Sequence, residues 1–238
     1  MPIRKPSVSA ECETCSLHPG CLLGQPLPEE DGECAEVVQR EMRVAAGDTL
    51  FRRSDPFRSV YVVCAGAVKT QRVTAAGDLV VTGFCLPGDI VGFESLGSRE
   101  HSYDAVATAP ARLVRLDVER LLGLCANKPA VYTWVMERIG HLLRRKDVDQ
   151  AWAKGLQTDG RILRFFLDLH ERTRPVAADN TLEGQLPMRK QDIAHYLNIT
   201  PETLSRNLSV LRRKRLLFIT HSRYALPNLE QARQLTQV

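Results

Sequence analysis

The first half of the chain alternates short apolar runs with turn residues. Strand-like runs are found at residues 59–63, 67–73, 79–84 and 111–116. Gly-Asp turn signals lie at 47–48, 77–78 and 88–89. Short strands separated by evenly spaced turns are typical of β-barrels and jelly rolls. Residues 37–126 are therefore predicted to form a β-barrel or jelly roll.

A helical period replaces the strand period after residue 117. We expect a short helix at 118–124, a long helix at 129–156 and a third helix at 159–172. Apolar residues recur along the long helix at Val131, Trp134, Val135, Ile139, Leu142 and Leu143. A long helix with an apolar stripe predicts a dimer contact over residues 127–157, and the alternative is packing against the β-domain of its own chain.

Two further helices joined by a tight turn are expected at 189–197 and from residue 200 onward. Thr200 suits an N-cap, and Pro201 suits the first helical position. Three leucines share one face of the second helix and four polar residues share another: Leu204, Leu208 and Leu211, against Glu202, Ser205, Arg206 and Ser209. Apolar runs at 216–220 and 224–226 predict a β-hairpin wing. Residues 158–238 are thus predicted to form a winged helix-turn-helix, which makes the fold class α+β.

The polar face of that second helix carries groups that can recognise base pairs. Arg206 can bond bidentately to guanine, Glu202 can accept from cytosine, and the Ser205 hydroxyl can bond several bases. Four basic residues suited to phosphate contacts follow: Arg212, Arg213, Lys214 and Arg215. Residues 188–223 contain eight Lys or Arg and two Asp or Glu, whereas the whole chain has a net charge of only +4. The C-terminal domain is therefore predicted to bind double-stranded DNA.

The segment 1–36 is rich in cysteine and is predicted to be a loop. Cys12, Cys15 and Cys21 follow the spacing CxxCx5C, and three thiolates on a short loop can hold a metal ion or an iron–sulfur cluster. No apolar run approaches the ~20 residues that span a bilayer, and the N-terminus lacks the apolar core of a signal peptide. We expect a cytoplasmic protein without membrane contact, whose cysteines are thiols or metal ligands rather than disulfides.

Three segments of the chain carry a family resemblance. They are DPFRSVYVVCAGAVKT (55–70), GFCLPGDIVGFESLG (83–97) and PETLSR (201–206). Together with the order of the domains, they resemble the family of the cyclic-AMP receptor protein and the fumarate-and-nitrate-reduction regulator, the CRP/FNR family. The cysteine loop is similar to that of the FNR branch. The resemblance covers nearly the whole chain and implies a transcription regulator rather than an enzyme.

The resemblance also implies a ligand, a target and partners. A homodimer would read a palindrome of TTGAT half-sites through Glu202, Ser205 and Arg206, and would work with RNA polymerase. The three N-terminal cysteines would hold an oxygen-labile 4Fe-4S cluster that supports the dimer, and oxygen or nitric oxide would remove it. Nucleotide-binding members hold the cyclic phosphate with an Arg-Ser pair. This chain has Ser-Arg-Glu-His-Ser at 98–102, so cyclic AMP is not expected as its ligand.

The chain departs from the FNR branch at the fourth cluster ligand. The family's cysteine position is occupied here by Val114, which cannot ligate iron. Four other cysteines are candidates: Cys85, Cys125, Cys34 and Cys64. We favour Cys85 because it lies within the family signature. A buried, unreactive thiol is the structural alternative for those inside the β-domain.

Other chemistries remain open at the sequence level. His18 lies within the cysteine loop and could complete a zinc site. His18, His101 and His141 could serve a haem, and Cys12 with Cys15 could sense oxidation as thiols. A thiol–disulfide enzyme using the CxxC pair would lack the βαβ context of that chemistry. No catalytic triad, phosphate-binding glycine loop or paired carboxylate is visible in the sequence.

Overall fold

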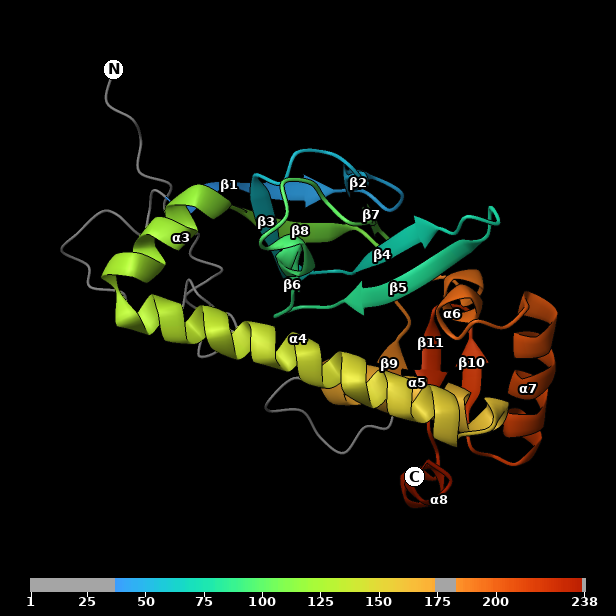
Figure 1. The fold of residues 1–238 in the computed structure, drawn as a ribbon. Helices are drawn as coiled ribbons and strands as arrows, with labels where there is room; N and C mark the ends of the chain where they lie inside the picture. The colour runs from blue at the N-terminus through green and yellow to red at the C-terminus, as the bar shows by residue number, and fades with distance from the viewer. Residues whose placement is uncertain (1–36, 174–182, 237–238) are drawn as a thin grey trace. The chain divides into compact units, whose positions relative to one another are not determined.

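The computed structural model describes residues 37–173 and 183–236 (Figure 1). Cys12, Cys15, Cys21, Cys34 and His18 lie outside the described residues. The chain divides into two compact units. The first extends to Leu142 apart from residues 73–82, and the second runs from Leu143 onward and includes residues 73–82.

Strands dominate the described part of the first half of the chain. They are β1 (Val38–Val44), β2 (Thr49–Phe51), β3 (Ser59–Ala65), β4 (Val68–Val73), β5 (Leu79–Cys85), β6 (Ile90–Val91), β7 (Asp104–Ala107) and β8 (Ala111–Asp117). They form two four-stranded sheets with the orders β1-β8-β3-β6 and β2-β7-β4-β5. This arrangement confirms the predicted jelly roll, which is built as two sheets rather than one closed ring.

The sheet β1-β8-β3-β6 buries apolar residues on both of its faces. One set packs between the two sheets, and we call it the inter-sheet cluster: Phe51, Tyr61, Val63, Val68, Val91, Tyr103, Ala105, Ala111 and Leu113. The other set packs under helices, and we call it the helix-facing cluster: Val37, Val60, Val62, Ile90, Phe93, Val114, Leu116, Val118, Leu121, Leu124, Val131, Trp134 and Val135. Successive strand residues point to opposite faces, so Leu113 joins the inter-sheet cluster and Val114 the helix-facing cluster.

Two helices follow the last strand of the jelly roll, as the sequence predicted. Helix α3 (Val118–Asn127) is capped by Asp117, whose carboxylate accepts from the backbone N of Arg120 at 3.0 Å. Lys128 is extended, and α4 (Pro129–Gly155) begins at the next residue. A proline at this position fits because its missing N–H would have no partner inside the helix.

Helix α4 presents apolar residues on two faces. The stripe recognised in the sequence packs largely onto its own domain, because Val131, Trp134 and Val135 are buried in the helix-facing cluster. Ile139 and Leu142 are half-buried against the same cluster. Three apolar residues of α4 are exposed instead: Tyr132 (52%), Met136 (42%) and, from the predicted stripe, Leu143 (58%). The predicted stripe therefore mixed two faces of the helix, since Leu143 is exposed and the other five residues are buried or half-buried.

The second unit contains the remaining described elements. They are α5 (Thr158–Thr173), β9 (Glu183–Gln185), α6 (Lys190–Tyr196), α7 (Pro201–Arg213), β10 (Phe218–Thr220), β11 (Arg223–Ala225) and α8 (Leu229–Gln234). The strands form a sheet of order β10-β11-β9, and Phe166 of α5 packs on Tyr224 at 5.4 Å between ring centroids. This is the predicted winged helix-turn-helix, and β9 adds a third strand to the predicted hairpin.

None of the helices in the described ranges combines the length and the apolar character that crossing a bilayer requires.

Candidate nucleic-acid interface

The turn between α6 and α7 depends on the conformation of Asn198. Its φ of 52° lies in the left-handed region, which asparagine adopts more readily than most residues. Thr200 then caps α7, and its Oγ1 accepts from the backbone N of Thr203 at 3.1 Å. Pro201 occupies the first turn of the helix. These contacts confirm the predicted start of the second helix.

Helix α7 separates an inner face from an outer face. Leu204 and Leu211 are buried, and Leu208 is half-buried. The four side chains predicted to read bases are all exposed: Glu202, Ser205, Arg206 and Ser209. Their spacing places them on one side of the helix, so the structure brings them together on an accessible surface.

Hydrogen bonds hold two of these side chains in place. Ser209 Oγ donates to the carbonyl of Ser205 at 3.0 Å, and Arg206 Nη2 donates to Thr203 Oγ1 at 3.4 Å. A serine whose proton is bonded inside the helix presents its lone pairs outward. Ser209 is therefore arranged to accept from a base rather than to donate.

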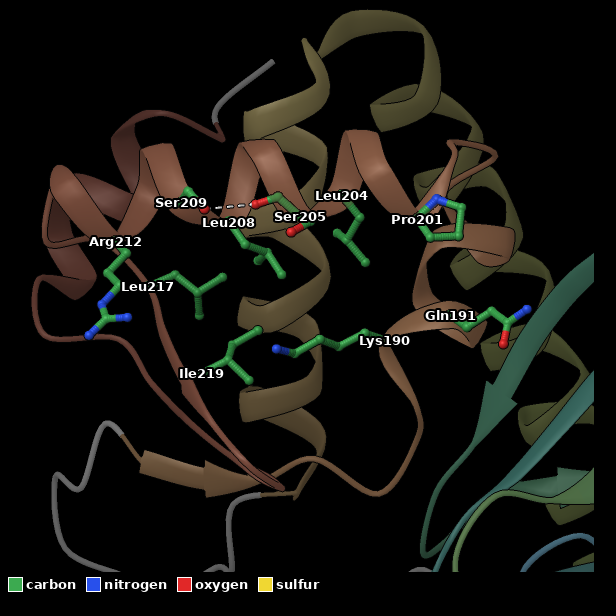
Figure 2. Close-up of a pocket in the computed structure, with 10 residues that line it drawn as sticks. All are labelled: Lys190, Gln191, Pro201, Leu204, Ser205, Leu208, Ser209, Arg212, Leu217 and Ile219. Atoms are coloured by element: carbon green, nitrogen blue, oxygen red, sulfur yellow. Dashed lines mark hydrogen bonds between the residues drawn. The ribbon is translucent and has the colours of Figure 1, made fainter.

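A hollow lies beside this face, between α7, the start of α6 and strand β10 (Figure 2). Its apolar lining consists of Pro201, Leu204, Leu208, Leu217 and Ile219. Its polar lining consists of Lys190, Gln191, Ser205, Ser209 and Arg212. The side chain of Lys190 extends across the hollow towards Ile219 (Figure 2). Two cations and two hydroxyls thus border one recess next to the exposed face of α7.

The cations of this unit differ in whether an acidic partner neutralises them. Lys214 Nζ lies 3.5 Å from Asp159 Oδ2, so one member of the basic run predicted for phosphate contacts is already paired. Lys190, Arg212 and Arg213 form no ion pair with any residue in the described ranges. Binding a phosphate costs less free energy for an unpaired exposed cation than for a cation that must first break an ion pair with a carboxylate.

The segment 94–103 of the jelly roll combines polar and aromatic side chains. The Tyr103 hydroxyl donates to Glu94, and burial together with that carboxylate raises the pKa of Tyr103 well above its usual value. His101 is 5% exposed and stacks on Phe51 with 3.5 Å between ring centroids. Burial lowers the pKa of His101, with Asp55 opposing that shift. Arg99, the cation nearest in sequence, is exposed.

The described cysteines lie on different sides of the sheet. Val114 is 4% exposed within the helix-facing cluster and pairs with Val62 across β8 and β3. Cys64 and Cys125 pack against that same cluster, whereas Cys85 packs against the inter-sheet cluster. Burial raises the pKa of the Cys125 thiol. Within residues 37–173 and 183–236, no three His, Cys, Asp or Glu side chains are grouped to hold a metal ion.

The histidines considered for a haem are equally dispersed. His101 is buried between aromatic rings in the jelly roll, with Phe57 edge-on at 5.2 Å between ring centroids. His141 is exposed on α4. His18 lies outside the described residues.

Comparison with known proteins gives these domains a family. Residues 41–128 match the family described as the cyclic nucleotide-binding domain, and residues 160–235 match the Crp-like helix-turn-helix domain. The transcriptional activator protein anr of Pseudomonas aeruginosa is 31% identical over 197 residues, which are 83% of this chain and 80% of that protein. The chain belongs to the CRP/FNR family. CRP/FNR proteins are transcription regulators, not enzymes.

Other relatives of this CRP/FNR regulator span the chain almost completely. The fumarate and nitrate reduction regulatory protein of Escherichia coli is 26% identical over 234 residues, which are 98% of this chain and 93% of that protein. The solved structure of FixK2 from Bradyrhizobium japonicum superposes with a TM-score of 0.75. It covers 84% of this chain and 98% of FixK2 at 24% identity, and at that identity the likeness concerns the fold.

Sequence reasoning on this CRP/FNR regulator missed part of the surface next to α7. Lys190 and Gln191 belong to α6 and reach the hollow only because α6 and β10 converge beside α7. The available signal was the adjacent basic pair Arg189-Lys190 at the predicted start of the first helix. The position of Thr203 in the sequence does not reveal its contact to Arg206, because that hydrogen bond depends on the rotamers of both side chains.

Proposed function

We propose that this CRP/FNR regulator binds a palindromic duplex with TTGAT-type half-sites as a homodimer. Base reading is assigned to Glu202, Ser205 and Arg206, with Ser209 beside them. The observation that carries the proposal is the common exposure of these four side chains on one face of α7. An Arg, an acid and hydroxyls at the start of a recognition helix match the donor and acceptor pattern of the major groove.

Phosphate contacts are assigned to the cations that flank this face. Arg212 and Arg213 were expected from the sequence, and Lys190 joins them because it borders the same hollow as Arg212. Lys214 is left out because Asp159 already neutralises it. Phosphate contacts fix the position of the helix without selecting sequence.

The exposed face of α4 is the proposed dimer contact. Tyr132, Met136 and Leu143 are exposed and Ile139 is half-buried; these residues are separated by four, three and four positions, which is the spacing of a coiled-coil seam. The next position of the repeat is Lys146, so two ammonium groups would face each other across the two-fold axis. A two-fold dimer of recognition helices requires a DNA site with inverted half-sites.

Binding to DNA is tested by fluorescence anisotropy with a labelled TTGAT palindrome. Arg206→Ala is expected to weaken binding by about 1–3 kcal/mol per half-site, the range for one bidentate base contact. Arg233→Ala removes a guanidinium from α8 and serves as the matched control. Equal binding of wild type to the palindrome and to a scrambled duplex would contradict the proposal.

The signal is proposed to be oxygen, redox state or nitric oxide, acting on a 4Fe-4S cluster held by Cys12, Cys15 and Cys21. Such a cluster would supply sensitivity to these oxidants when bound. The described residues satisfy the requirement for a fourth ligand only in part, because Val114, at the family's cysteine position, has no atom that can bind iron. Cys85 was favoured from the sequence, but Cys64 and Cys125 share the helix-facing cluster with Val114. Val37, the first described residue after the cysteine segment, is 1% exposed in that cluster too.

Anaerobic purification tests the cluster directly. Wild type is expected to contain iron and sulfide and to show a visible absorption band. Cys85→Ala, Cys64→Ala, Cys125→Ala and Cys34→Ala are then compared, and the variant that loses iron identifies the fourth ligand. Zinc in place of iron, a haem spectrum, or a colourless protein that responds to thiol oxidants would contradict the cluster while leaving DNA binding intact.

Cyclic AMP is not proposed as the ligand, although the jelly roll belongs to the nucleotide-binding family. The segment 94–103 offers a buried aromatic stack at His101 and a Glu94–Tyr103 pair in place of a buried cation. Glu100, which follows Arg99 in the sequence, would repel a cyclic phosphate. We further propose that the regulator works in the cytoplasm and contacts RNA polymerase at its promoter.

A further inference from the structure

A short line of hydroxyl groups leads from the cap of α7 to Arg206. Thr200 Oγ1 accepts from the backbone N of Thr203 at 3.1 Å and donates to Thr203 Oγ1 at 3.0 Å. Thr203 Oγ1 also accepts from Arg206 Nη2 at 3.4 Å. A threonine oxygen has two lone pairs, and here both are used by these two donors. The cap residue therefore orients the hydroxyl that meets the arginine.

The backbone of Thr203 is held as well as its side chain. Its N–H is bonded by the cap, and its carbonyl accepts from Asn207 Nδ2 at 2.8 Å. Thr203 is half-buried, whereas Arg206 is exposed. A fixed acceptor at the base of a long exposed side chain restricts which rotamers that side chain adopts.

We propose that Thr203 is a positioning residue for Arg206, holding the guanidinium in the orientation that base reading requires. The proposal rests on the assignment of Arg206 as a base reader. A guanidinium has five N–H donors, so one bond to Thr203 leaves four for the base. Bidentate contact needs a defined plane, and an arginine ordered before binding loses less conformational freedom when it meets DNA.

The chemistry of the side chain gives a clean pair of variants. Thr203→Val keeps the β-branched shape and the backbone N–H of the cap but removes the hydroxyl. Thr203→Ser keeps the hydroxyl and removes only the methyl group. An effect that appears in Thr203→Val and not in Thr203→Ser is therefore due to the loss of the hydroxyl. Thermal melts of both variants establish that the domain is folded.

The first experiment measures discrimination on labelled TTGAT palindromes in which each base pair is changed in turn. The position at which Arg206→Ala loses discrimination identifies the base pair that Arg206 reads. At that position Thr203→Val is expected to lose about two- to tenfold in discrimination, the effect of one intramolecular hydrogen bond, and Thr203→Ser is expected to match wild type. In an Arg206→Ala background, Thr203→Val is expected to add nothing further.

Two outcomes would overturn the positioning role. Thr203→Val could weaken binding to every duplex alike and flatten the dependence of affinity on salt, which would make Thr203 a phosphate contact. Alternatively, the discrimination lost in Thr203→Val could add to the discrimination lost in Arg206→Ala, which would show that the two residues act independently.

A second measurement keeps the inference separate from DNA binding. In the free protein, 15N relaxation of the Arg206 side chain is expected to show greater mobility in Thr203→Val than in wild type or Thr203→Ser. Equal mobility in all three proteins would overturn the positioning role even if DNA is bound. Greater mobility with no binding of wild type to the palindrome would overturn the proposed base reading instead.

Discussion

At the scale of single residues, Asn198 fixes the turn of the recognition motif. Its left-handed φ of 52° is strained for any β-branched side chain. Asn198→Val is expected to lower the free energy of unfolding of the DNA-binding domain by about 1–2 kcal/mol, measured by chemical denaturation. Asn198→Gly is the matched control, because glycine adopts this conformation without strain. Equal losses in both variants would show that the Asn198 side chain matters for another reason.

Lys190 provides a second residue-scale prediction. Removing one phosphate contact lowers the slope of log K against log salt by about 0.9, so Lys190→Gln is expected to lower it by roughly 1.8 in a dimer. Affinity should fall similarly for specific and non-specific duplexes. Lys69→Gln makes the same charge change on β4 of the jelly roll and is expected to leave the slope unchanged. A Lys190→Gln effect confined to one sequence would indicate base reading.

Single residues also mark where sequence reasoning succeeds and where it stops. The exposure of Glu202, Ser205 and Arg206 follows from helical spacing alone, and so it was predicted. Lys190 was missed because its role depends on tertiary approach of another helix. Thr203 was missed because a hydroxyl at that spacing is compatible with many partners.

At the scale of elements, α4 carries apolar residues on two sides. Trp134 and Val135 face the jelly roll of the same chain, while Tyr132 and Met136 are exposed on the other side. Apolar periodicity indicates that a helix is buried on one face. When a helix is apolar on two faces, the two stripes overlap in the sequence and the period does not separate them. The sequence therefore predicted the helix and its bounds well, and could not assign each apolar residue to its partner.

Leu143→Glu tests the exposed face of α4 as a dimer contact. A carboxylate at the last apolar position of the proposed seam must be desolvated next to its symmetry mate, so the variant is expected to be monomeric. Sedimentation velocity measures the change. Leu122→Glu places the same charge on a residue of α3 that is also exposed, and it is expected to leave the dimer intact. Dissociation of both variants would argue against a specific seam.

Lys146 gives the complementary prediction for the same helix. Replacing it with leucine removes the repulsion between two ammonium groups and extends the apolar repeat. Lys146→Leu is therefore expected to tighten the dimer at low salt by more than at high salt, because salt screens the wild-type repulsion. The dimer dissociation constant, measured by sedimentation at both salt concentrations, checks this, and an unchanged constant would place Lys146 off the seam.

At the scale of the whole molecule, each compact unit carries its own tryptophan. Trp134 is buried beneath the jelly roll, and Trp152 lies in the second unit with Arg164 at 4.0 Å from its ring centroid. Trp152→Phe and Trp134→Phe variants therefore report separately on the unfolding of the first and second units. Changes of period along the chain predicted the order of the β-domain, the long helix and the winged domain. They did not predict the order in which the strands pair within each sheet.

The first unit is expected to lose stability in mild acid through His101. Burial lowers the folded pKa of His101 below its ordinary 6.5, so the unfolded chain binds a proton first as pH falls. Stability is fully present above pH 6.5 and declines below it until the lowered folded pKa is crossed. Denaturation followed by Trp134 should show this decline, and His101→Phe, which preserves the aromatic stack, should reduce it. An unchanged pH profile in His101→Phe would assign the acid sensitivity to other groups.

The two apolar sides of α4 have a thermodynamic consequence. If the outer side of α4 contacts a second subunit, association stabilises the same helix that packs against the jelly roll. The melting temperature of the jelly roll then depends on protein concentration through mass action. Dilution should lower the melting temperature reported by Trp134 in wild type but not in a monomeric variant. In a regulator built this way, the stability of the jelly roll rises with the concentration of the protein.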